Sequence, residues 1–176
     1  MKFDKMKTNK ASGVLLRSKS LFFDWLFICA YLLLLLIITI TFYFLVLNGT
    51  PEFTNFQSQL IATLTSVVPI IIIFSNMEGS KNYASWGKKK ANLMVIYKDM
   101  PMKRSIFRNI IKFLPWQFGH MSTINGIYND FDTPFSMIFF ALSMILSIIY
   151  ILMAFIRNDN RHLADILAGS KVIKSC

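Results

Sequence analysis

The stretch Leu21–Leu47, LFFDWLFICAYLLLLLIITITFYFLVL, decides the fold because Asp24 is its only charged residue. A helix of about 20 apolar residues is long enough to cross a bilayer, so this run can span a membrane. A secretory signal has a shorter apolar region, of about 7–15 residues. We therefore expect the segment to stay in the protein as a first transmembrane helix.

The composition of the whole chain supports a membrane protein. Hydrophobic residues make up 55% of the 176 positions and charged residues only 16%, with a net charge of +10. A soluble domain has about a quarter of its residues charged, so water is not the only solvent of this chain. Two cysteines are too few for a disulfide scaffold, and the apolar content excludes disorder. The positive charge favours an anionic membrane surface over nucleic acid, so we expect a lipid bilayer and no nucleic acid as partner.

Two further apolar segments are long enough to cross a membrane. Leu60–Ser75 lies within an uncharged stretch covering residues 56–77 and contains Pro69, which a membrane helix tolerates where neighbours satisfy the freed carbonyl. Pro134–Ile156 has no charge at all, and its three serines share one helix face. Small polar residues let membrane helices approach closely, so we expect this serine face to pack against another helix.

The segment Ile106–Ile127 is ambiguous. It carries Arg108, Lys112, His120 and a central proline, so hydropathy leaves three alternatives: a weak spanning helix, a re-entrant segment or an interfacial helix.

The distribution of lysine and arginine favours the spanning alternative. If the segment crosses, every Lys and Arg falls on one side, and the stretches 48–57 and 128–133 on the other side contain neither. Basic residues favour the cytoplasmic side, so this arrangement fits four helices with both termini cytoplasmic. A three-helix arrangement would place Arg157, Arg161, Lys171 and Lys174 outside. We therefore predict an all-α fold, a polytopic membrane bundle forming a single domain over residues 1–176, with a basic cytoplasmic loop at 78–105.

Charged residues near the ends of these helices are the candidate functional residues. Asp24 lies three residues into the first apolar run, and Arg17 lies two helical turns earlier on the same face, where the two side chains can pair. The alternative for Asp24 is a partly wet carboxylate favoured by the helix dipole. Near the C-terminus, Asp165 faces away from a short apolar stripe, which by itself predicts a solvated carboxylate in an amphipathic tail that stops at Gly169.

The central loop is basic and contains a short apolar run. Trp86-Gly87-Lys88-Lys89-Lys90 lacks the spacing of a phosphate-binding loop, so we interpret its lysines as contacts to lipid phosphates. Leu93–Tyr97 reads as an extended segment followed by a turn. The predicted lipid-phosphate contacts are Lys88, Lys89, Lys90, Lys103 and Arg104. We predict no catalytic residue, no metal site and no cofactor.

Three motifs occur in a fixed order along the chain. The first is an arginine followed seven residues later by an aspartate inside the first helix, RSKSLFFDW, with Arg17 and Asp24. The second joins a Gly-Lys pair to an extended segment, a turn and an Arg-Asn pair, WGKKKANLMVIYKDMPMKRSIFRN, which covers residues 86–109 and includes Arg108.

The third motif is Ala164-Asp165-Ile166-Leu167-Ala168-Gly169-Ser170. With these motifs, the chain resembles the RDD family of bacterial membrane proteins, named for one arginine and two aspartates, over about residues 14–173. It departs from the family pattern at Ala164, where a histidine is usual, and its own His162 lies two residues earlier. The resemblance implies that Asp165 approaches Arg17 and Asp24 at the inner face.

The resemblance also implies a transport role, including sodium–proton exchange for some members. We expect a protein of the bacterial cytoplasmic membrane, from a low-GC organism, that transports a small cation or ligand through a polar cluster of Arg17, Asp24, Asp165 and Arg108. The alternative is a non-catalytic accessory, assembly or immunity-type protein. A homo-oligomer or another membrane protein is the expected partner. An intramembrane enzyme is disfavoured because the sequence contains no nucleophile–base pair.

Overall fold

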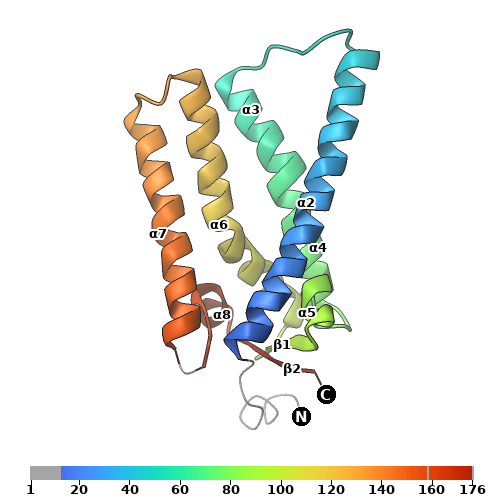
Figure 1. The fold of residues 1–176 in the computed structure, drawn as a ribbon, viewed down its shortest axis with the longest axis vertical. Helices are drawn as coiled ribbons and strands as arrows, with labels where there is room; N and C mark the ends of the chain where they lie inside the picture. The colour runs from blue at the N-terminus through green and yellow to red at the C-terminus, as the bar shows by residue number, and fades with distance from the viewer. Residues whose placement is uncertain (1–12, 158, 176) are drawn as a thin grey trace.

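The computed structural model describes residues 13–157 and 159–175, and it confirms the helical membrane fold (Figure 1). Three helical segments in this part are long and apolar enough to cross a membrane: Val14–Leu45, Asn55–Gly79 and Pro134–Ile156. The bundle is built from α2 (Val14–Leu45), the continuous segment α3 (Asn55–Ala62), η1 (Thr63–Val67) and α4 (Val68–Gly79), then α6 (Pro101–Tyr128) and α7 (Pro134–Ile156).

The ambiguous segment forms α6, a helix that runs the length of the bundle (Figure 1). Near its start, Arg108 contacts Glu78 at the end of α4. At its other end, the Tyr128 hydroxyl donates a 2.6 Å hydrogen bond to the carbonyl of Phe53, just before α3. Since α6 extends beside the whole α3–η1–α4 segment, it is neither re-entrant nor a helix lying across the bundle.

Small elements gather at one end of the bundle, which we call the sheet end (Figure 1). It contains α5 (Trp86–Lys90), β1 (Leu93–Tyr97), α8 (Leu163–Leu167) and β2 (Ser170–Lys174). The strands pair antiparallel, from Leu93 opposite Lys174 to Tyr97 opposite Ser170. The extended segment predicted at Leu93–Tyr97 is confirmed, while its partner β2 is an addition to the predicted all-helical fold. The opposite end, with the loops at 46–54 and 129–133, is the loop end.

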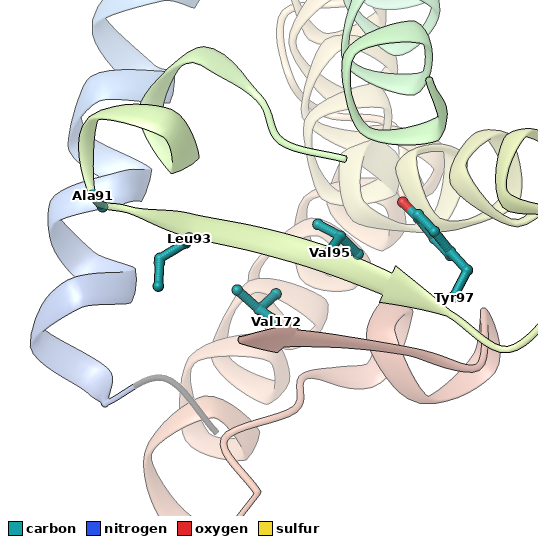
Figure 2. Close-up of a cluster of buried hydrophobic side chains, with 5 residues drawn as sticks. All are labelled: Ala91, Leu93, Val95, Tyr97 and Val172. Carbon is teal, nitrogen blue, oxygen red and sulfur yellow. The ribbon is translucent and has the colours of Figure 1, made fainter. Parts of the chain in front are cut away.

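The two strands carry a small apolar core of their own (Figure 2). Leu93, Val95 and Tyr97 alternate along β1, and Val172 of β2 packs beside them. Ala91 completes this cluster, and Leu16 at the start of α2 packs against it. The sheet is therefore fastened to the base of α2, which fixes the elements that carry the charged residues.

Two prolines interrupt the hydrogen bonding of α4 and α6, and tyrosines from neighbouring helices compensate. A proline cannot donate to the carbonyl four residues earlier. That carbonyl is Thr65 for Pro69, and it accepts a 2.6 Å hydrogen bond from the Tyr31 hydroxyl of α2. It is Ile111 for Pro115, and the Tyr150 hydroxyl of α7 bonds it at 2.6 Å. These contacts confirm that neighbours satisfy the freed carbonyls.

The serine face predicted for α7 packs against α6. Ser122 of α6 donates to the carbonyl of Ser136 at 2.8 Å, and Ser143 of α7 donates to the carbonyl of Pro115 at 2.7 Å. The remaining surface of α7 and most of α2 are apolar and exposed, as expected for lipid-facing helices.

Candidate functional site

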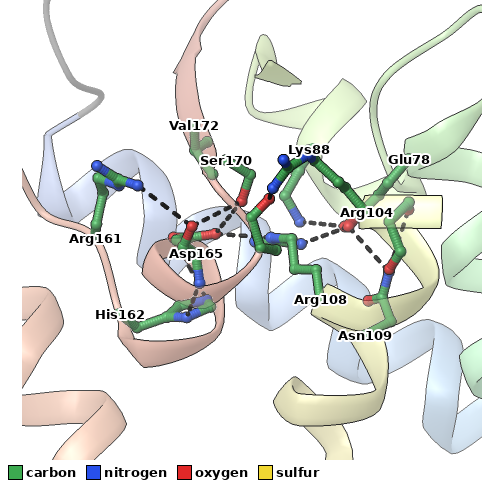
Figure 3. A network of polar contacts seen from close by, with 12 residues as sticks. Glu78, Lys88, Arg104, Arg108, Asn109, Arg161, His162, Asp165, Ser170 and Val172 are labelled. Carbon is green, nitrogen blue, oxygen red and sulfur yellow. Dashed lines mark hydrogen bonds and ion pairs between the residues drawn. The ribbon is translucent and has the colours of Figure 1, made fainter. Parts of the chain in front are cut away.

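Six buried charged side chains form a continuous series of ion pairs at the sheet end. Figure 3 shows its central part, from Asp165 through Arg108 and Glu78 to Lys88. In order along the series, which we call the charge chain, they are Arg17, Asp165, Arg108, Glu78, Lys88 and Asp24. They come from α2, α8, α6, α4 and α5, and each side chain is at most 10% exposed. Three positive groups thus balance three negative ones.

Asp165 is the meeting point of one half of the charge chain. Its Oδ1 accepts a 2.7 Å hydrogen bond from Arg108 Nε, and its Oδ2 lies 3.5 Å from Arg17 Nη1. The Ser170 hydroxyl, at the start of β2, donates to the same Oδ1 at 3.3 Å. Burial alone would raise the pKa of the Asp165 carboxyl, but Arg108, His162 and Arg17 hold it well below its usual range. Asp165 is therefore an anion.

His162 lies beside the Asp165 carboxylate and caps the helix that carries it. Its Nδ1 accepts the backbone N–H of Asp165 at 3.3 Å and so caps the N-terminus of α8. Its Nε2 lies 3.6 Å from Asp165 Oδ2. Burial lowers the pKa of His162 to about 4, although Asp165 opposes this, so the ring is neutral at pH 7. This chain therefore has a His–Asp contact although position 164 is an alanine.

Asp24 is held by α5 at the other end of the charge chain. Its Oδ2 accepts the Ser85 hydroxyl at 2.8 Å and lies 3.7 Å from Lys88 Nζ, while its Oδ1 accepts the Gly87 N–H at 2.8 Å. A Cβ on Gly87 would lie 2.2 Å from the carbonyl oxygen of Ser20. The glycine of the second motif is therefore required because α5 packs directly on the backbone of α2.

Glu78 joins the two halves and was not among the predicted site residues. Its Oε1 accepts Lys88 Nζ at 2.7 Å, and its Oε2 contacts Arg108 and the Asn109 amide nitrogen, the latter at 3.3 Å. Sequence reasoning placed Glu78 at the edge of the basic loop. The available signal was its position directly after an uncharged membrane segment, where a carboxylate needs a cationic partner.

The structure changes three expectations about this region. Asp165 is fully buried rather than solvated, because α8 and β2 enclose it. Arg17 pairs with Asp165, and the expected Arg17–Asp24 pair is replaced by the Asp24 contacts to α5. Lys88 is a buried ion-pair partner of Glu78 and Asp24, so it is not a surface lysine available to lipid phosphates. The arginine and both aspartates of the family motifs do lie in one series of contacts.

The other predicted lipid-phosphate contacts are at the sheet end. Lys89, Lys90 and Lys103 are exposed. Arg104 is half-buried: it contacts Asp99 and donates a 3.0 Å hydrogen bond to the carbonyl of Ala168, at the end of α8. Arg104 therefore fastens α8 to the start of α6, while the three lysines face outward.

A second polar group, the mid-bundle cluster, lies halfway along the bundle between η1 and α6. Gln117 Nε2 donates to the Thr63 hydroxyl at 3.0 Å, and His120 Nε2 lies 3.4 Å from the Ser66 hydroxyl. Trp116 stacks beside His120 with ring centroids 5.6 Å apart. The cluster comprises Thr63, Ser66, Trp116, Gln117 and His120.

The cluster coincides with irregular helix geometry. Thr63–Val67 is a π-helix, a feature found frequently at functional sites. Ser66 and His120 are twelve residues from Glu78 and Arg108 along their respective helices, or about 18 Å from the charge chain at 1.5 Å per residue. Sequence reasoning found no carboxylate at this depth and missed the cluster, although Pro69 and Pro115 marked the two interrupted helices.

These features define a polytopic helical membrane protein with a buried charge chain at one end. The RDD family model matches residues 12–169, and the chain belongs to the RDD family. No curated protein and no solved structure matches the chain.

Proposed function

We propose that the protein transports a small monovalent cation across the bacterial cytoplasmic membrane in exchange for protons, with its sheet end and both termini in the cytoplasm. The observation that carries the proposal is the mid-bundle cluster at two facing interrupted helices. Many secondary transporters bind substrate near the membrane midplane, between discontinuous helices. The positive charge gathered at the sheet end supports the cytoplasmic orientation.

The mid-bundle cluster offers neutral oxygen atoms to a cation. Thr63 and Ser66 contribute hydroxyls and Gln117 contributes an amide oxygen, and the interrupted helix brings backbone carbonyls close to them. Hard cations bind to oxygen ligands, and a site without a carboxylate holds an ion weakly enough to release it. A small cation such as Na⁺ or Li⁺ is therefore the substrate class that these groups suit.

His120 supplies a coupling to protons. Its Nε2 lies beside the Ser66 hydroxyl, so a proton on the ring places a positive charge next to the oxygen ligands. A proton and a cation then repel each other at one site, and each favours release of the other. The nearest charged residue on the same helix is Lys112, eight residues or about 12 Å away, so His120 is the titratable group of this cluster.

The charge chain has a different role in this proposal. Each of its carboxylates already has a cationic side chain as partner, so a cation binding there would have to displace an arginine or lysine. We assign to it the task of holding the sheet end closed. Because it joins five elements, separating any of them from the others breaks an ion pair, which opens the bundle toward the cytoplasm.

Proteoliposomes loaded with a pH-sensitive dye test the proposal. Pulses of Na⁺, Li⁺ or K⁺ should change the internal pH in vesicles containing the wild-type protein, and His120→Gln should reduce the initial rate. Equal, background-level signals from all three cations in the wild type would refute the exchange.

The alternative is a non-catalytic accessory or assembly protein, and the surface of α2 favours it. The apolar part of α2 is almost entirely exposed at the surface of the bundle, and α2 packs chiefly against α5 at the sheet end. A second membrane protein, or a second copy of this chain, would cover its outer half. Crosslinking in native membranes followed by affinity purification distinguishes this role: co-purification of a partner in fixed ratio supports it, and recovery of the protein alone counts against it.

A further inference from the structure

A fourth cation, the partly buried Lys112, lies beside the charge chain and has no carboxylate of its own. The three arginine and lysine side chains of the charge chain are balanced by three carboxylates. Lys112, one turn beyond Arg108 on α6, forms no ion pair among the described residues. Its ammonium lies 4.7 Å from the ring centroid of Phe74 and 5.1 Å from that of Phe113. The region therefore carries an excess positive charge when Lys112 is protonated.

A cavity of about 60 Å³ adjoins this excess charge. Four of its six polar lining residues are cationic, and the three carboxylates of the charge chain are not among the lining residues. A space of this size is several times what one water molecule requires. The polar residues around it are Arg17, Ser20, Lys88, Arg108, Lys112 and His162.

The elements around the cavity place it at the edge of the apolar part of the bundle. Its apolar wall consists of Leu21 of α2 and Ala154 of α7 together with Leu93 and Val172 of the two strands. These two helices are the ones with the least buried surface. A group entering here meets lipid-facing helices on one side and four cationic side chains on the other.

We propose that this cavity binds a phosphate group, with Lys112 as its principal ligand and Arg17 and Ser20 as further donors. Guanidinium and ammonium groups bind oxyanions through short charge-assisted hydrogen bonds. Within a spanning bundle an uncompensated ammonium is costly, and a bound anion removes that cost. The phosphate comes either from the headgroup of an anionic lipid or from free inorganic phosphate, and the site is independent of the proposed transport.

Two binding measurements on the purified full-length protein in detergent separate these sources. Native mass spectrometry with phosphatidylglycerol, compared with diacylglycerol as a phosphate-free lipid, tests the headgroup. Thermal stability in sodium phosphate, compared with sodium chloride at equal ionic strength, tests the free anion. The proposal predicts preference for the phosphate compound in at least one arm. Equal responses to the phosphate and phosphate-free compounds in both arms would overturn it.

Three variants identify the site. Lys112→Met removes the charge at similar side-chain size and should weaken phosphate binding at least tenfold. Lys112→Arg keeps the charge and should retain binding, which separates the loss of a ligand from a folding defect. Lys81→Met removes an exposed lysine after α4 and should bind like the wild type. Wild-type affinity in Lys112→Met, or equal losses in Lys112→Met and Lys81→Met, would contradict the assignment.

Discussion

Arg108 Nε donates a 2.7 Å hydrogen bond to Asp165 Oδ1, which joins the third long helical segment of the bundle to the short helix near the C-terminus. Both side chains are almost fully buried. Arg108 also contacts Glu78, so one guanidinium connects α4, α6 and α8. A buried charge is tolerated when its partners remain, and removal of one partner leaves the others uncompensated.

Asp165→Asn should therefore destabilise the protein strongly. Arg17 and Arg108 would lose their shared carboxylate, and breaking a buried ion pair in this way costs about 3–5 kcal/mol. The free energy of unfolding in detergent measures the effect. Asp159→Asn is the matched control, because Asp159 is a third exposed and pairs with Arg157 near the surface. Surface pairs contribute about 0–1 kcal/mol, so equal losses in the two variants would contradict this description.

Gly87→Ala should prevent α5 from docking on α2. The added methyl would lie 2.2 Å from Ser20 O and 2.7 Å from Asp24 Oδ1, and both belong to the helix beneath. We expect lower thermal stability. We also expect faster hydrogen exchange of the backbone amides of residues 84–91, because the Gly87 N–H would lose its hydrogen bond to Asp24. Gly13→Ala, where nothing lies within 4 Å of the added Cβ, should behave like the wild type. An unchanged Gly87→Ala protein would show that α5 does not pack this closely.

The neutral state of His162 predicts an acid-sensitive stability. Its pKa of about 4 in the folded protein lies below its usual 6.5, so the unfolded chain takes up a proton first as the pH falls. The folded state therefore loses about 2–3 kcal/mol between pH 6.5 and pH 4, and this loss is absent above pH 6.5. The pKa of Asp165 is also lowered in the folded protein, so this carboxylate contributes stability at neutral pH. That stability is lost only when the pH falls below the ordinary pKa of an aspartate, about 4.

His162→Asn separates these two effects. Asparagine is a good helix N-cap and does not titrate, so the variant should keep α8 and lose the slope above pH 4. The measurement is the free energy of unfolding as a function of pH from 8 to 4.5. The same slope in the variant and the wild type would assign the acid sensitivity to another group.

The Tyr150 hydroxyl should stabilise the protein, because Pro115 cannot donate the helical hydrogen bond that the carbonyl of Ile111 would otherwise accept. Tyr150→Phe leaves the carbonyl of Ile111 without its 2.6 Å hydrogen bond, and an unsatisfied buried group costs about 1–3 kcal/mol. In the Pro115→Ala background the new N–H can bond Ile111 directly, so Tyr150→Phe should cost less. A double-mutant cycle on the free energy of unfolding measures this coupling. Additive effects would show that the hydroxyl does not replace the helical hydrogen bond.

The spanning segments followed from the sequence because apolar length and the placement of basic residues depend on local composition. The predicted cluster already placed Arg17 and Arg108 with Asp165, but the contact from Ser170 did not follow, because Ser170 reaches Asp165 only once α8 and β2 are packed. The burial of Lys88 could not be predicted either, because a run of three lysines is typical of a solvated face. Its partner Glu78 is distant from Asp24 in the chain, and only the docking of α5 brings both to the same ammonium.

The mid-bundle cluster was equally difficult to predict. Thr63 and Ser66 lie 54 residues before their partners Gln117 and His120 on another helix, and the facing positions of these pairs depend on helix rotation. Helix rotation is set by packing contacts such as those of Ser143 and Tyr150, which periodicity alone does not define.

The initial rate of Na⁺-driven proton movement in proteoliposomes, compared between the wild type, His120→Gln and Thr41→Ala, tests the proposed transport most directly. Thr41 is an exposed threonine on α2 whose hydroxyl bonds only its own helix at Ile37, so its removal is the matched control. We expect equal rates for the wild type and Thr41→Ala and at least a tenfold lower rate for His120→Gln. A His120→Gln rate equal to that of the wild type, or wild-type rates no higher than those of empty vesicles, would contradict it.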